Sequence, residues 1–266
     1  MKIGFYTYQY IDVAGMPIPE VLEIVAADGY DGIDISATRG DTLDPSLFPQ
    51  DDRRLYREAA DRLGLEINAV VTHLPMINSV WDGQPINIPG AIDLAIDVGA
   101  SIVTIHIGSN DESEHPFDLA WESAVEHLQD ACKFAASQGI LIALDAIWPK
   151  TLLDTPERVI QFIEDVDSPV LCHNYDPCLL ALADIEPGPV VRKLAGFIRH
   201  VHVKDYRGTF HNHHFHVPGD GKLNYKTWIN ALKRAKYKGY LTIECFKHHD
   251  LKRASRIGKR TIEKFV

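Results

Sequence analysis

The sequence is poor in three features that would point to other classes of protein. It has four cysteines among 266 residues and no Cys-x-x-Cys pair, so we interpret the cysteines as reduced and mostly buried. No apolar run approaches the roughly 20 residues of a membrane-spanning helix. The opening stretch, MKIGFYTYQY, lacks the charged and apolar regions of a signal peptide. These absences predict a cytoplasmic protein without a membrane partner.

Positive charge is also scarce. The chain has 27 Lys and Arg against 37 Asp and Glu, a formal net charge of -10 and a pI of about 5.7. An acidic surface repels a phosphate backbone, so a nucleic-acid partner is not expected. Apolar residues make up 45% of the chain and charged residues 24%, which is typical of a globular protein with a large core.

Short apolar runs alternate with longer amphipathic runs along the whole chain. The strand-like runs are 2–6, 32–36, 66–73, 101–108, 140–146, 169–176, 197–205 and 239–245. The helix-like runs are 18–30, 50–63, 89–98, 117–138, one starting at 154, 187–195, 225–236 and 250–264. Asp154 or Thr155 is expected to cap the run at 154, with Pro156 in its first turn. This alternation predicts a (β/α)8 TIM barrel that forms a single domain over residues 1–266.

Polar side chains stand at the ends of the expected strands, where a barrel of this kind places its chemistry. Barrel strands are normally near-continuous apolar runs, and a charged residue there needs a partner, a metal ion or solvent. In chain order these residues are Tyr6, Asp34, Ser36, His73, His106, Asp145, Asp176, His202 and Glu244.

Four of these residues come from four consecutive strands and can converge at the barrel mouth. They are Asp145, Asp176, His202 and Glu244. Three carboxylates and one imidazole make an oxygen-rich set, which suits Mn²⁺, Mg²⁺ or Co²⁺ better than a thiolate-type zinc site. The sequence therefore predicts one divalent metal ion with an open position for substrate oxygens.

Several segments are characteristic enough to suggest a family. They are NYDPCLL at 174–180, IRHVHVKD at 198–205 and PGDGKLNYKTWINALKRAKYKGYLTIE at 218–244. With them, the chain resembles the sugar phosphate isomerase/epimerase family of xylose-isomerase-like TIM barrels over essentially its whole length. The resemblance maps the metal ligands onto the same four residues and favours Mn²⁺, with Mg²⁺, Co²⁺ or Zn²⁺ as alternatives. It also implies a carbohydrate or cyclitol substrate, Glu244 and Asp145 as the acid/base pair, and a homodimer or higher homo-oligomer.

The chain departs from the family pattern close to this expected site. Asp145 stands where the family usually has glutamate, which draws the carboxylate back by about 1.5 Å. Pro177, Cys178 and Leu179 follow Asp176, where the family usually has a histidine that helps to hold substrate. A glutamate that ketose 3-epimerases place after the strand-5 ligand is missing from AIWPKTLL. A standard free-ketose 3-epimerase is therefore less expected.

Other residues are candidates for contacts with substrate. His106 is a candidate catalytic base or substrate contact, and the remaining candidate substrate-binding residues are Tyr6, His73, Lys204 and Arg207. Six of the thirteen histidines lie between His200 and His216. Of these we expect only His202 to bind metal. We interpret His200 as core, and the other four as part of a loop that follows strand 7.

Three functions are consistent with these residues. The first is a metal-dependent isomerase or epimerase that removes a proton next to a carbonyl and works through an enediolate. The second is a metal-dependent lyase or dehydratase on a keto-sugar, inosose or 3-keto-glycoside, which starts with the same proton and then expels a leaving group. The third is a non-catalytic barrel that binds metal or sugar. Product mass separates the first two, because isomerisation leaves the mass unchanged.

Overall fold

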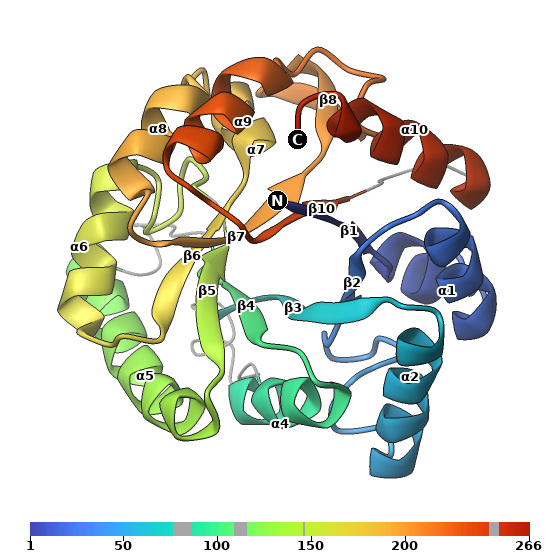
Figure 1. Ribbon diagram of the computed structural model, residues 1–266. Coiled ribbons are helices and arrows are strands. Elements are labelled where there is room, and N and C mark those ends of the chain that lie inside the picture. The colour runs from blue at the N-terminus through green and yellow to red at the C-terminus, as the bar shows by residue number, and fades with distance from the viewer. Residues whose placement is uncertain (77–86, 109–115, 146, 245–249) are drawn as a thin grey trace.

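Eight parallel strands close into a barrel in the computed structural model, and helices surround them (Figure 1). The structure describes residues 1–76, 87–108, 116–145, 147–244 and 250–266, and for residues 73–75 the backbone alone. The order around the barrel is β1-β10-β7-β6-β5-β4-β3-β2. The strands are β1 (Lys2–Tyr6), β2 (Gly32–Ser36), β3 (Glu66–Pro75), β4 (Ile102–His106), β5 (Leu141–Asp145), β6 (Leu171–Tyr175), β7 (Ile198–Val203) and β10 (Tyr240–Ile243).

The helices alternate with these strands as the sequence predicts. They are α1 (Ile18–Ala27), α2 (Gln50–Arg62), α4 (Ile88–Val98), α5 (Phe117–Gln138), α6 (Pro156–Val166), α8 (Pro187–Leu194), α9 (Tyr225–Arg234) and α10 (Leu251–Glu263). Thr155 caps α6, since its side chain accepts from the Arg158 amide at 3.2 Å, and Pro156 opens the helix. The predicted TIM barrel is therefore confirmed.

Four elements among the described residues were not predicted. A π-helix, η1 (Gln9–Val13), follows β1, and the short helix α7 (Pro177–Leu182) follows β6. The histidine-rich segment after β7 was expected to be a loop, which is wrong. It forms an antiparallel ribbon of β8 (Asp205–Thr209) and β9 (Asn212–His216). Its two-residue turn, Phe210 and His211, lacks the Asn-Gly or Asp-Gly pair that usually announces a hairpin.

The barrel interior is unusually polar toward one end. A small apolar cluster of Ala69, Ile102, Ala143 and Cys172 fills part of the interior. Two residues further along their strands, Asp145 and Asn174 replace Ala143 and Cys172 on the same face, because side chains of a strand alternate. Most TIM barrels fill this space with branched apolar side chains. The polar filling therefore marks the end of the barrel where chemistry is expected.

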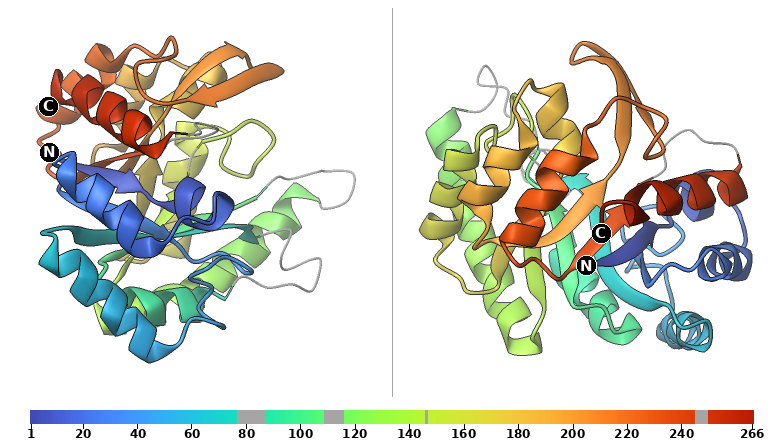
Figure 2. Two further views of the ribbon diagram at one scale, coloured as in Figure 1. Left: turned by 90° about the vertical axis from the view of Figure 1, so that its right-hand side faces the viewer. Right: turned by 45° about the horizontal axis from the view of Figure 1, so that its top comes forward.

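The chain termini lie together at one end of the barrel, and the β8–β9 ribbon projects at the opposite end (Figure 2, left). That opposite end carries the loops that follow the strands. Among the described residues, no helix is both long and apolar enough to cross a membrane.

Candidate active site

His202, on β7, lies at the centre of a buried cluster of carboxylates. Its Nδ1 is 3.3 Å from Glu244 Oε1, 3.9 Å from Asp145 Oδ1 and 2.9 Å from Asn174 Nδ2. Burial alone would lower the pKa of His202, but the carboxylates of Glu244, Asp34 and Asp145 raise this pKa to about 9. The cluster therefore favours a positive charge at His202.

Lys204 connects two further members of the cluster. Its Nζ lies 2.5 Å from Asp176 Oδ2 and also donates to Glu244 Oε2. Burial would lower the pKa of Lys204, but Asp176 and Glu244 raise this pKa well above its usual value. Burial would raise the pKa of Glu244, but Lys204 and His202 hold it below its usual value. Glu244 is thus an ionised carboxylate at neutral pH.

Asp176 is held by the helix that it begins. Its Oδ1 accepts from the backbone amides of Cys178 at 2.9 Å and Leu179 at 3.1 Å, so Asp176 is the N-cap of α7. Burial raises the pKa of Asp176, although Lys204 opposes this. The Pro177-Cys178-Leu179 sequence, which departs from the family pattern, thereby fixes the direction of the carboxylate.

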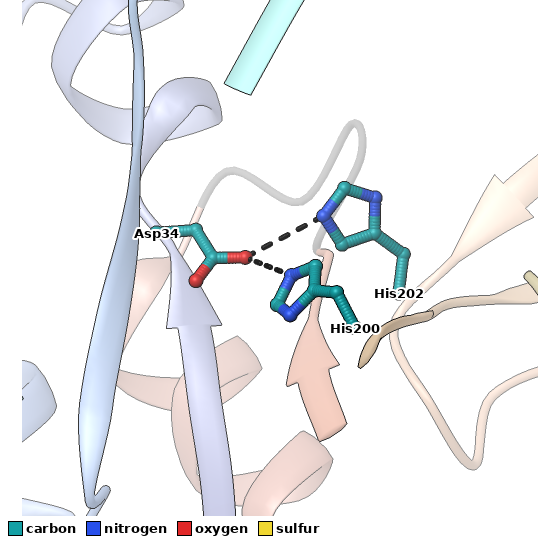
Figure 3. A group of neighbouring side chains, drawn as sticks. All are labelled: Asp34, His200 and His202. Carbon is teal, nitrogen blue, oxygen red and sulfur yellow. Dashed lines mark hydrogen bonds and ion pairs between the residues drawn. The ribbon is translucent and has the colours of Figure 1, made fainter. Parts of the chain in front are cut away.

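A second polar group lies below His202 (Figure 3). Asp34, from β2, accepts from His200 Nε2 at 2.6 Å. Asn68 Nδ2 lies 3.2 Å from Asp34 Oδ1 and 3.1 Å from His200 Nδ1. Because Nδ1 accepts from Asn68, the hydrogen on His200 sits on Nε2 and points at Asp34. His202 Nε2 also faces Asp34, at 3.5 Å.

Two overlapping sets of ligands could therefore hold a metal ion. In the lower set, one ligand atom each from Asp34, His200 and His202 lie within 4.8 Å of one another. An ion there would have to replace the hydrogen between His200 and Asp34. In the upper set, His202 Nδ1 faces Glu244 and Asp145 at distances close to the roughly 3 Å that separates neighbouring ligands of one ion. Asn174 Oδ1 is also buried there without a hydrogen bond among the described residues.

Among the described residues, the lower set is the one whose ligand atoms all lie within 4.8 Å of one another, whereas the upper set has the chemistry that a divalent ion prefers. It offers three carboxylates and a ring nitrogen, and an oxygen-rich set is what Mn²⁺ or Mg²⁺ prefers. The lower carboxylate, Asp34, faces the other ring nitrogen of His202. A metal-binding histidine commonly donates its second N–H to such a carboxylate.

The other candidate residues take different places. The Tyr6 ring is stacked with the His202 ring, with centroids 5.9 Å apart, and is buried. His106 on β4 lies opposite Asp145 on the neighbouring strand β5 in the sheet register, and it is partly buried. Arg207 is exposed on β8, where its Nε donates to the Asp220 carbonyl at 2.6 Å. The side chain of His73 lies outside the described part of the chain.

Sequence reasoning missed two features of the site. Asn174 was not singled out, although it lies two residues before Asp176 and so shares its face of the chain. The ribbon was also missed. Trp148 packs against Phe210 at 5.1 Å and His213 at 5.9 Å between ring centroids. The ribbon therefore packs on the segment that follows β5, and its Phe215 ring lies 5.3 Å from Lys204 Nζ in the cluster.

The chain matches the family model described as xylose isomerase-like TIM barrel over residues 22–264. It belongs to this family. It is 24% identical to fructoselysine 3-epimerase from Shigella flexneri, with 92% of this chain and 90% of that protein covered. It is 26% identical to inosose dehydratase from Geobacillus thermodenitrificans, with 73% of each covered.

The fold is also shared with solved structures. The 3-keto-D-glucoside 4-epimerase from E. coli matches with a TM-score of 0.80 at 18% identity, with 99% of both chains covered. At this identity the match supports the fold. Together with the family match and the sequence relatives, the expectation of an enzyme of the sugar isomerase and epimerase type is confirmed.

Proposed function

We propose that this protein is a divalent-metal-dependent isomerase or epimerase of a sugar or keto-sugar, which removes a proton next to a carbonyl. The buried cluster of Asp145, Asp176, His202 and Glu244 at the barrel mouth carries this proposal. These four residues would hold the ion, with Mn²⁺ favoured. When bound, the ion supplies positive charge beside the carbonyl oxygen of the substrate.

The protein's own groups would move the proton. Glu244 is ionised and has one carboxylate oxygen toward His202 and the other toward Lys204. Asp145 is the more exposed carboxylate of the two, with 18% of its side chain accessible against 4% for Glu244. We assign the two carboxylates to opposite faces of the reacting carbon as general base and general acid. His106, next to Asp145, is a further candidate base.

The substrate is proposed to be a small carbohydrate or cyclitol. Two sequence relatives are named for such compounds, a fructoselysine 3-epimerase and an inosose dehydratase. Tyr6 and Lys204 remain the substrate-binding candidates nearest the cluster, while the predictions for His73 and Arg207 stay untested. A cytoplasmic location, the absence of a nucleic-acid partner and a homo-oligomeric state also remain predictions.

The test is exchange of solvent deuterium into the carbon next to the carbonyl. The Mn²⁺-loaded protein should incorporate one deuterium into an accepted ketose or inosose, and the chelator-treated protein should not. A protein that binds Mn²⁺ but exchanges no proton across a panel of ketoses, inososes and 3-keto-glycosides would contradict the proposal. It would instead favour a non-catalytic barrel.

A lyase or dehydratase is the second candidate. The short Asp145 favours it, because this carboxylate is held at 2.6 Å by Asn174 and has less reach than a glutamate. Proton removal by Glu244 would then be followed by loss of a leaving group instead of reprotonation from the second face. Mass spectrometry of the product separates the two reactions, because loss of water or an aglycone lowers the mass.

A further inference from the structure

A buried ammonium group lies among the proposed metal ligands. Lys204 Nζ contacts Asp176 and Glu244, and the Phe215 ring of the β8–β9 ribbon packs 5.3 Å from it. The lysine is buried, with 6% of its surface exposed. One lysine thus pairs with two of the four residues proposed to hold the ion.

The oxygens of these two carboxylates are already engaged. Asp176 Oδ1 accepts from two amides of α7, and its Oδ2 accepts from Lys204. Glu244 Oε1 faces His202, and its Oε2 accepts from Lys204. A metal ion that binds Asp176 Oδ2 or Glu244 Oε2 must therefore displace Lys204 or share that oxygen with it.

Electrostatics makes the ammonium and the ion competitors. Both are stabilised by the same buried carboxylates, and each is repelled by the other over a few ångströms in a medium that screens poorly. We propose that Lys204 is an internal cation that competes with the divalent ion for Asp176 and Glu244 and so sets the metal affinity of the site. The inference rests on the proposed function, because it takes the same residues as ligands.

The experiment is a titration of the full-length, chelator-treated protein with Mn²⁺ alone by isothermal calorimetry. Lys204→Met removes the charge and nearly keeps the length of the side chain. It should bind Mn²⁺ at least about tenfold more tightly than wild type, because the competing charge is gone. Lys204→Gln keeps hydrogen-bond donors without the charge and should shift the affinity in the same direction, even where Lys204→Met folds poorly.

Lys222→Met is the matched control. Lys222 also packs on an aromatic ring, with Nζ 4.9 Å from the Tyr206 centroid, but donates to the Gly208 carbonyl away from the cluster. The Lys222→Met protein should bind Mn²⁺ as tightly as wild type does.

Thermal unfolding gives a second measurement. Lys204→Met should melt lower than wild type in chelator and gain more from Mn²⁺, because the ion replaces the lost charge.

The outcomes separate this inference from the proposed function. Folded Lys204 variants with unchanged or weaker Mn²⁺ affinity would overturn it and make Lys204 a group that prepares the carboxylates for the ion. If wild type binds no Mn²⁺ but Lys204→Met does, the competition is supported, while the metal dependence proposed for the natural protein fails. If neither binds, both fail.

Discussion

The buried His173 is expected to make the folded protein less stable in acid, and the size of this effect follows from its surroundings. It lies on β6 between Cys172 and Asn174, whose side chains face the barrel interior, so the His173 ring faces the helix layer. The ring is 1% exposed, and its Nδ1 has no hydrogen bond among the described residues. Burial lowers the pKa of His173 from 6.5 to about 4, although Asp145 partly opposes this.

Proton linkage gives the direction in which stability changes with pH. The unfolded chain takes up a proton at this histidine below pH 6.5, whereas the folded protein does so only near pH 4. Stability from His173 is therefore complete above pH 6.5 and is lost as the pH falls toward 4. At 1.36 kcal/mol per pH unit, the full loss is about 3 kcal/mol, of which about 2 kcal/mol appears between about pH 7.5 and about pH 5.

Urea unfolding of wild type and His173→Leu at both pH values measures the contribution of His173 to the free energy of unfolding. Each protein serves as its own reference, so any packing defect in the variant cancels in the pH difference. The variant should lose about 2 kcal/mol less than wild type between the two pH values. His127→Leu, at an exposed position of α5, should keep the wild-type pH dependence. Equal acid sensitivity in wild type and His173→Leu would refute the reasoning.

Three further predictions concern the site and its support. Glu244→Gln should lower the rate of deuterium exchange by about 100- to 10,000-fold, as measured by mass spectrometry, and a rate near wild type would remove Glu244 as the base. Asp34→Asn should weaken Mn²⁺ binding by about 10- to 100-fold in calorimetry, because His202 loses its orienting carboxylate; unchanged affinity would make the Asp34–His200 pair purely structural. Asp205→Asn should lower the melting temperature by about 5–10 °C in scanning calorimetry. Asp205 accepts from the amides of Gly219, Gly221 and Leu223 and from the Tyr225 hydroxyl, and an unchanged melting temperature would contradict this account.

The barrel itself could be predicted from local patterns. Its strands read as short apolar runs, and helix boundaries such as Thr155 and Pro156 carry their own capping chemistry. The β8–β9 ribbon could not be predicted in the same way, because its strands are mostly polar without a regular apolar alternation and its turn has no typical turn residues. Its stability comes partly from contacts distant in sequence, such as Trp148 with Phe210.

The candidate site could be predicted in part. The parallel barrel brings strand ends together, so Asp145, Asp176, His202 and Glu244 could be grouped from the sequence alone. The group does lie together, but the sequence did not indicate what neutralises it. Lys204 was a candidate substrate contact, and the structure adds that it joins Asp176 to Glu244. Such pairing depends on side-chain rotamers and on distances between strands. The spacing of residues along the sequence gives neither.

Two histidines of the dense segment, His200 and His202, point inward from β7, and Lys204, the residue after the strand, continues their line. His200, His202 and Lys204 follow one another at every second position, so they form a column from the barrel interior to its mouth. His200 meets Asp34 at the bottom, His202 faces the carboxylates in the middle, and Lys204 joins Asp176 to Glu244 at the top. A one-residue slip of β7 would turn all three toward the helices and bring Val201 and Val203 inward. The site is therefore specified by the register of this strand with β6 and β10, and the remaining histidines serve the ribbon that the same strand leads into.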